Sequence, residues 1–219
     1  MTAGVEIRND SGILQLDQTY GVYKLVDART IATDGSDSIV SGAAFYGSTF
    51  SYTVTAADSA IVCVRPVSGG ASVNVVIASN GDGTVTVSGA IGSGSQGDKT
   101  AALYLFDASP YTHSADSFGL EVFDAQGRSV FHSSDRILRL SQTFVSGRDM
   151  AILPVKPAVA VRDFAQQGLW YYWGAWYLTG DSSAPVSVYQ YPVAPVAGSV
   201  SSASDPDVSY LLADVTNYL

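Results

Sequence analysis

Short segments that alternate between apolar and polar residues recur along this chain, and most of them end at Gly, Ser, Asp or Asn. A period of two in segments rich in β-branched and aromatic residues is typical of strands with one buried face. No amphipathic pattern indicates a helix of ten residues or more. Besides the repeat described next, the pattern predicts strands at 49–55, 59–65, 72–78, 84–88, 101–107, 158–163, 168–178 and 186–191. We therefore expect an all-β chain of antiparallel, sandwich-like sheets.

A pattern of 22 residues occurs twice, at 4–25 and again 115 positions later at 119–140, with four identical positions. In each copy an alternating strand leads into a turn that ends at Gly12 or Gly127, and a second apolar segment follows. Glycine at that position suits a hairpin turn that needs a positive φ. Two later segments match in the same order, 61–65 with 158–162 and 103–106 with 188–191. The repeat predicts a duplicated unit whose copies each open with a β-hairpin.

The predicted organisation is two related β-sandwich-like domains in tandem. The first spans 1–112, the smaller second spans 117–195, and a linker with a C-terminal docking segment fills 196–219. Ser88–Lys99 is rich in Gly and Ser and is predicted as a flexible loop. The last twelve residues, from Val208 onward, regain apolar character. Such a segment is expected to dock onto its own core or onto a neighbouring subunit.

Composition and charge narrow the set of partners. With 47% hydrophobic and 14% charged residues the chain is expected to fold, and its net charge of −9 opposes binding to a polyanion. The basic residues form no cluster, so neither nucleic acid nor an anionic membrane surface is an expected partner. No apolar stretch is long enough to span a membrane, and polar residues interrupt the N-terminal segment where a signal peptide needs an apolar core. We expect synthesis in a cytoplasm and a buried thiol at Cys63, which lies in an apolar run.

Candidate catalytic groups are few. His132-Ser133-Ser134-Asp135 contains the residue types of a hydrolase triad, but neighbours in a strand point to opposite faces, so a surface or turn histidine is expected. Gly92–Thr100 approaches a phosphate-binding loop, yet Asp98 stands where glycine must precede the lysine. We expect a flexible hairpin loop there, and no enzyme activity.

Metal and cofactor sites are not expected either. Asp34-Gly35-Ser36-Asp37 and Asn80-Gly81-Asp82 carry oxygen atoms that suit Ca²⁺, but neither completes a coordination loop that ends in a bidentate carboxylate. No Cys or His pair has zinc spacing. Turn formation is the expected role of both acidic segments, with Ca²⁺ binding as the open alternative. No cofactor is expected.

All three tryptophans lie in one run, Leu169–Leu178. As a strand, this run has two aromatic faces, one with Trp170, Tyr172 and Trp176 and the other with Tyr171, Trp173 and Tyr177. One face can fill a core, and the opposite face then needs a partner. A subunit interface is expected, with internal packing and stacking on a saccharide or another receptor as alternatives. The predicted interface residues, from this run and the C-terminal segment, are Trp170, Tyr171, Trp173, Trp176, Tyr177, Tyr210, Leu211, Leu212 and Tyr218.

The second copy of the repeat resembles a motif of small tail proteins of long-tailed bacteriophages, found in tail-fibre, baseplate and minor tail components. The residues that carry the resemblance are Gly119-Leu120-Glu121-Val122-Phe123-Asp124-Ala125-Gln126-Gly127, followed by Phe131, Ser133, Ser134 and Arg136. The first copy departs from this motif, with Gln18-Thr19 in place of the paired serines and Gly21 in place of the arginine. The resemblance covers both hairpins and, loosely, the strands between them, and leaves out the aromatic run and the C-terminal segment.

The resemblance implies a non-enzymatic structural protein of the virion tail tip, made in the host cytoplasm and assembled with other tail proteins. It also implies a homo-oligomer, with a trimer among the possible forms, and in some cases contact with a host receptor. The alternative function is a host-recognition module that binds a surface polysaccharide or pilus through the aromatic run. Its candidate polar partners are Asp163, Gln166, Gln167 and Asp181. A hydrolase of the cell envelope would need a pair of acidic residues that the sequence does not reveal.

Overall fold

Strands make up all of the regular structure in the part of the chain that the computed structural model describes. That part comprises residues 6–8, 10, 14–17, 21–37, 46–68, 71–111, 118–141, 145–156, 161–164, 168–177, 187–192 and 209–219, and no helix occurs among them. The prediction of an all-β chain is therefore confirmed. In chain order the strands are β1 (Glu6–Arg8), β2 (Leu14–Asp17), β3 (Lys24–Thr33), β4 (Tyr46–Thr55), β5 (Ile61–Ser68), β6 (Ser72–Ser79), β7 (Thr84–Ser93), β8 (Lys99–Asp107), β9 (Glu121–Phe123), β10 (Ser129–His132), β11 (Leu140–Ser141), β12 (Met150–Lys156), β13 (Val161–Phe164), β14 (Gly168–Tyr177), β15 (Ser187–Pro192) and β16 (Ser209–Asp214).

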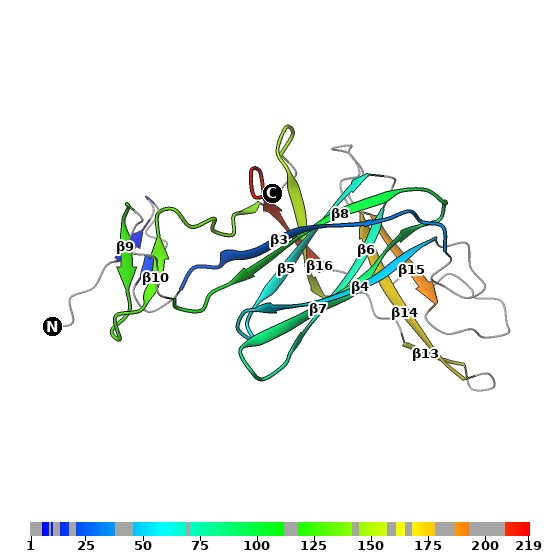
Figure 1. Cartoon of the computed structure of the whole chain (residues 1–219), viewed down its shortest axis with the longest axis horizontal. Helices are drawn as coiled ribbons and strands as arrows, with labels where there is room; N and C mark the ends of the chain where they lie inside the picture. Colours follow the sequence, from blue (N-terminus) through cyan, green and yellow to red (C-terminus); the bar gives the residue numbers. More distant parts are fainter. Residues whose placement is uncertain are drawn as a thin grey trace.

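Most strands belong to two six-stranded antiparallel sheets (Figure 1). Sheet 1 has the order β11-β16-β12-β5-β8-β3. Sheet 2 has the order β13-β14-β6-β7-β4, and its sixth strand, β15, also pairs with β14. The remaining strands form two separate hairpins, β1–β2 and β9–β10. Figure 1 places both hairpins at one end of the molecule and β13–β15 toward the other end.

The main core lies between the two sheets. Along β4 the side chains alternate, with Phe50, Tyr52 and Val54 packed against the core and the hydroxyl residues between them exposed. Buried side chains of both sheets form one cluster, which includes Val64, Leu103, Leu105 and Ile152 from sheet 1 and Val73, Val85, Val87 and Ile91 from sheet 2. Removal of this apolar surface from water is the main favourable contribution to folding.

The outer face of sheet 1 is buried as well. Cys63, Tyr104 and Phe106 belong to a second buried cluster on this face. The C-terminal residues Val215 and Tyr218 pack in the same cluster and cover the sheet, so the C-terminal segment docks on its own core. The prediction that Cys63 is a buried thiol is confirmed, and burial raises the pKa of this thiol to about 12.

The two copies of the repeat form hairpins with the same register. The pairs are Glu6↔Asp17, Ile7↔Leu16 and Arg8↔Leu14 in the first hairpin, and Glu121↔His132, Val122↔Phe131 and Phe123↔Ser129 in the second. Every pair of the second hairpin is a pair of the first moved by 115 positions, and both hairpins have an irregularity at the same place in the register. The prediction that each copy opens with a β-hairpin is therefore confirmed.

Strands from before and after residue 112 share both sheets. β12 pairs with β5 in sheet 1 through Ile152 and Val64, and β14 pairs with β6 in sheet 2 through Trp176 and Val73. The predicted boundary at 112–117 thus does not separate one sheet from the other. Two pairs of segments match in the sequence. Their first copies lie in β5 and β8, which are neighbours in sheet 1. Their second copies lie in β13 and β15, which both pair with β14 in sheet 2.

Ser88–Lys99, predicted as a flexible loop, is only partly a loop. β7 continues to Ser93, and β8 begins at Lys99. A Cβ at Gly89 would lie 2.0 Å from the carbonyl oxygen of Asn74 on the neighbouring strand. The loop prediction is therefore wrong for the first half of this segment, because glycine here permits a close approach of two strands instead of forming a turn.

Candidate interaction surface

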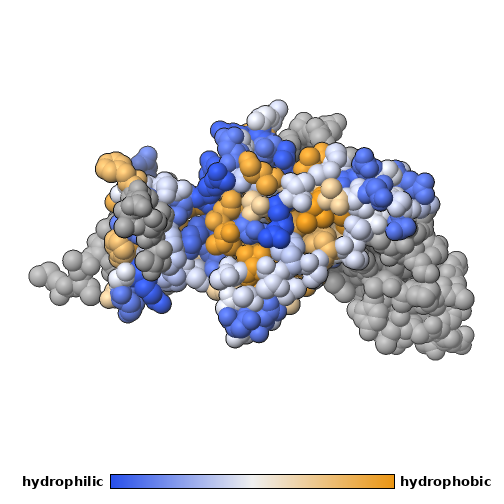
Figure 2. Space-filling view, viewed as in Figure 1, coloured by the Kyte–Doolittle hydropathy of each residue, from blue (hydrophilic) through white to orange (hydrophobic). Residues whose placement is uncertain are grey.

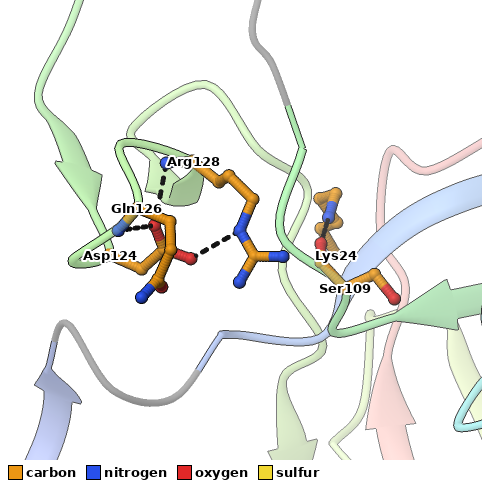
Figure 3. A network of polar contacts seen from close by, with 5 residues as sticks. All are labelled: Lys24, Ser109, Asp124, Gln126 and Arg128. Atoms are coloured by element: carbon orange, nitrogen blue, oxygen red, sulfur yellow. Dashed lines mark hydrogen bonds and ion pairs between the residues drawn. The ribbon is translucent and has the colours of Figure 1, made fainter.

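The turn of the β9–β10 hairpin is held by the carboxylate of Asp124 (Figure 3). Its Oδ1 accepts hydrogen bonds from the N–H groups of Gln126 and Arg128 at 2.9 and 2.8 Å, and its Oδ2 lies 2.8 Å from Arg128 Nε. The pKa of this carboxyl lies below its ordinary value, chiefly because the Arg128 N–H donates to it. Gly127 has a φ of 75°, in the left-handed region that favours glycine. The predicted turn is confirmed, and the side chain of its first residue, Asp124, stabilises it.

The opposite end of this hairpin is closed by Ser133. The Leu120 N–H donates to Ser133 Oγ at 3.0 Å, and the Ser133 N–H donates to the Leu120 carbonyl oxygen at 2.8 Å. A Cβ at Gly119 would lie 2.3 Å from Ser133 Oγ, so a larger residue would displace that hydroxyl. Gly119 and Ser133 therefore have structural roles in this hairpin.

His132 ends β10 and is 1% exposed. Its Nδ1 lies 2.6 Å from Ser134 Oγ, and Asp135 Oδ2 accepts a hydrogen bond from the His132 main-chain N–H at 2.8 Å. The Asp135 N–H donates back to the His132 carbonyl oxygen, so the prediction of a turn position is correct. The prediction of a surface position is wrong, because the imidazole lies directly beside the Gly119 backbone, which has no side chain to displace it. These contacts stabilise a turn.

Lys24 and Tyr111 join the β9–β10 hairpin to the sandwich. Tyr111 Oη donates to Asp135 Oδ2 at 2.5 Å, and the Tyr111 main chain exchanges two hydrogen bonds with β10. Lys24 Nζ donates to the Ser109 carbonyl oxygen at 2.6 Å (Figure 3). The same atom lies 3.9 Å from the centre of the Tyr111 ring. Burial lowers the pKa of the Lys24 ammonium, and the negative charges of Asp107 and Asp135 oppose that shift. The hairpin is thus held to β3 and to the segment that follows β8.

Three large apolar side chains of this region are exposed. They are Phe118, Leu120 and Phe123, with exposed fractions of 103%, 55% and 50%, and we call them the hairpin patch. Figure 2 shows apolar surface at the end of the molecule where β9 and β10 lie. Val122 is instead buried against Val130. Leu120 precedes the first residue of β9, so the alternation of the strand does not extend to it.

The C-terminal residues predicted as part of a partner interface fall into two groups. Leu212 and Tyr218 are buried, each 5% exposed, and Tyr218 Oη donates to the Ile137 carbonyl oxygen at 2.6 Å. Tyr210 and Leu211 are 37% and 43% exposed. Within this chain Leu212 and Tyr218 therefore stabilise the core, while Tyr210 and Leu211 are accessible, and their contact with a partner stays a prediction.

The aromatic run forms β14, in agreement with its alternation. β13 pairs with its first half, β15 with its second half, and Trp176 lies opposite Val73 of β6. An interface role stays a prediction for five residues of this strand, of which the structure describes the main chain only: Trp170, Tyr171, Trp173, Trp176 and Tyr177. Among the candidate polar partners of a receptor, Asp163 pairs with Leu169 through the main chain, and Gln166, Gln167 and Asp181 lie outside the described residues.

The remaining candidate sites form turns. Asp82 Oδ1 accepts hydrogen bonds from the N–H and the hydroxyl of Thr84, and Asp34 Oδ1 accepts from the N–H and the hydroxyl of Ser36. Lys99 belongs to the segment whose sequence is similar to a phosphate-binding loop. It is buried, and its Nζ donates to the Gly97 carbonyl oxygen at 2.6 Å. No three His, Cys, Asp or Glu side chains of the described residues gather as a metal site requires. Among the same residues, no helix has the length and apolar character to cross a membrane.

Comparisons with known proteins identify no relative. Neither protein-family models nor curated proteins match the sequence, and no solved structure matches the fold.

Proposed function

We propose that this chain is a structural component of a phage tail tip, in the tail fibre or the baseplate, and that it acts by oligomeric assembly without catalysis. The hairpin patch is the observation that supports this proposal most, because it lies in the segment that resembles phage tail proteins. In that segment polar side chains fix the main chain, while Phe118, Leu120 and Phe123 remain exposed. A rigid element that presents large apolar side chains is suited to contact with a neighbouring subunit.

In this proposal the hairpin patch is the apolar centre of a larger interface. Large apolar side chains bury roughly 150 to 250 Å² each, whereas a stable interface buries about 800 Å² on each partner. The patch alone therefore supplies less than a standard interface. Exposed polar residues beside it, such as Arg128 with 56% of its side chain exposed, complete the contact as a polar rim.

The proposal includes a duplication within this chain. The shared register of β1–β2 and β9–β10 supports a common origin of the two hairpins. We propose two related sandwiches in tandem because the matched segments follow one another in the same order in both halves of the sequence. Because the first copy departs from the motif at Gln18, Thr19 and Gly21, we expect the two hairpins to make different contacts.

Substitution of the hairpin patch tests the assembly role. We expect the triple variant Phe118→Ser, Leu120→Ser, Phe123→Ser to keep its free energy of unfolding within about 1 kcal/mol per site, because these side chains are exposed, and to form smaller oligomers than the original chain. Val67→Ser, at a β5 position that is 49% exposed, is the matched control and should assemble normally. Urea unfolding and light scattering after size exclusion measure the two effects. Unchanged assembly of the folded triple variant would contradict the proposed interface.

Location in the particle tests the virion role separately. Gold-labelled antibody against the full chain should mark the distal end of the tail on phage particles whose genome encodes it. Label on the head, or particles without the chain by mass spectrometry, would refute the tail-tip assignment.

The alternative proposal is a host-receptor module of the tail tip that binds a polysaccharide or pilus through the aromatic run. Its support is the concentration of all three tryptophans in β14, next to β6 in sheet 2. Binding of the isolated protein to host cells, lost in Trp170→Ala with retained folding, would favour it over a purely structural role.

A further inference from the structure

Among the described residues, no strand pairs with the outer edge of β4, the last strand of sheet 2. The Ala56 N–H donates to the Gly83 carbonyl oxygen, so the even-numbered residues of β4 bond to β7 and the odd-numbered ones point away from it. Gly47, the first of these, donates to the Asp37 carbonyl oxygen at 2.8 Å. Within the described residues, the outward main-chain groups of the other odd-numbered residues have no partner: Thr49, Ser51, Thr53 and Thr55.

β4 lacks the features by which proteins protect such edges, which are charges, prolines, bulges and short length. Its ten residues pair with β7 without a shift in register and include neither a proline nor a charged residue. β3, the edge of sheet 1 on the same side of the sandwich, has a bulge between Leu25 and Asp27 and carries the Asp27–Arg29 ion pair. The other edge strands are shorter, with two residues in β11, four in β13 and six in β15. Among the described strands β4 is therefore the edge best able to accept a further strand.

Charge favours a second copy of this chain as the partner of that edge. The chain has a net charge of −9, so two copies repel each other over most of their surfaces. None of the charged residues lies in β4, β6 or β7. The exposed side chains of β4 itself are threonine and serine hydroxyls, and the exposed Asp37 lies at the Gly47 end of the edge. Contact of two copies through β4 thus brings no charged residue of this strand against the second copy.

We propose that β4 pairs with β4 of a second copy in an antiparallel, two-fold symmetric arrangement. The free positions, 49 to 55, are centred on Tyr52, so a two-fold axis there uses all of them. Thr49 then lies opposite Thr55 of the second copy, and Ser51 opposite Thr53, which gives hydroxyl pairs on the exposed face. The two copies of sheet 2 become one continuous sheet. A two-fold contact of this kind uses the same surface on both subunits and therefore closes.

This inference deepens the proposed assembly role, because it names a main-chain edge as one homotypic contact in addition to the hairpin patch. The two can be tested apart. A chain that oligomerises only through other residues refutes the β4 contact and leaves the assembly role intact.

Thr53→Pro tests the pairing with little effect on the fold. The Thr53 N–H points away from β7, so proline removes an outward donor and no hydrogen bond of the β4–β7 ladder. By symmetry the dimer loses two hydrogen bonds, and we expect its dissociation constant to rise about 30-fold. Thr53→Ser, which keeps both the N–H and the hydroxyl, is the control and should dimerise like the original chain. Sedimentation equilibrium measures both constants.

Two further measurements keep the test decisive if Thr53→Pro does not fold. Ser51→Lys places a positive charge on each copy, diagonally across the two-fold axis from the same charge on the other copy, and should also weaken the dimer. In the unaltered protein, the amides of Thr49, Ser51, Thr53 and Thr55 should exchange with solvent at least about tenfold more slowly at high than at low protein concentration. Rapid exchange of these four amides at every concentration, or a dimer unaffected by Ser51→Lys, would overturn the proposal.

Discussion

Polar side chains fix the main chain around the β9–β10 hairpin. Asp124 holds the turn through Gln126 and Arg128, and Ser133 closes the opposite end against Leu120. Residue types alone predicted the turn, because glycine at its last position has a known backbone preference. They did not predict that His132 is buried, since the residue that makes room for it, Gly119, is distant in the sequence and adjacent only after folding.

Cys63 gives a prediction for alkaline pH. Burial raises its thiol pKa to about 12, whereas the unfolded chain titrates near the ordinary value of 9.0. Between these values the folded state binds more protons than the unfolded state, so the free energy of unfolding falls as pH rises. At pH 10.5 this loss amounts to about 2 kcal/mol. Urea unfolding between pH 8 and 10.5 should show a steeper decline for the original chain than for Cys63→Ala.

Equal slopes for the two proteins would contradict this account of Cys63. Tyr52 serves as an internal reference, because burial raises its pKa to about 12 as well and both proteins retain it. The difference between the slopes therefore reports on the thiol alone.

At the scale of elements, alternation predicted most strands and failed where both faces of a strand are buried or its register is broken. β12 was missed because Met150, Ala151 and Ile152 are all buried, so no period of two appears in its sequence. β3 was missed because charged residues and a bulge interrupt its alternation. The open edge of β4 could not be read from the sequence either, since it depends on which strands become neighbours.

The C-terminal segment gives a prediction at this scale. Tyr218 covers Phe106 on the outer face of sheet 1, with ring centres 6.2 Å apart, and its hydroxyl bonds to Ile137. We expect Tyr218→Ala to lower the free energy of unfolding by about 3 kcal/mol, because it opens a cavity over this face. Leu219→Ala, at a position that is 60% exposed, should change it by less than about 0.5 kcal/mol. Denaturant unfolding compares the two, and similar values would show that the segment does not stabilise sheet 1.

For the whole molecule, the structure combines a two-sheet core with surfaces that suit association. The strands of sheet 2 other than β13 carry no charged residue, while the chain as a whole is acidic. The hairpin patch lies at the end of the molecule opposite β13–β15 (Figure 1). These two surfaces are distinct, so a chain can contact more than one neighbour at once. Such an arrangement supports extended assembly, which is the role proposed for this chain.

The molar mass of the unaltered protein in solution tests this account most directly. Sedimentation equilibrium over micromolar to hundreds of micromolar concentrations should give a mass that is a multiple of the 22.9 kDa chain, and the multiple should fall on dilution. A mass of 22.9 kDa at every concentration would contradict self-assembly of this chain.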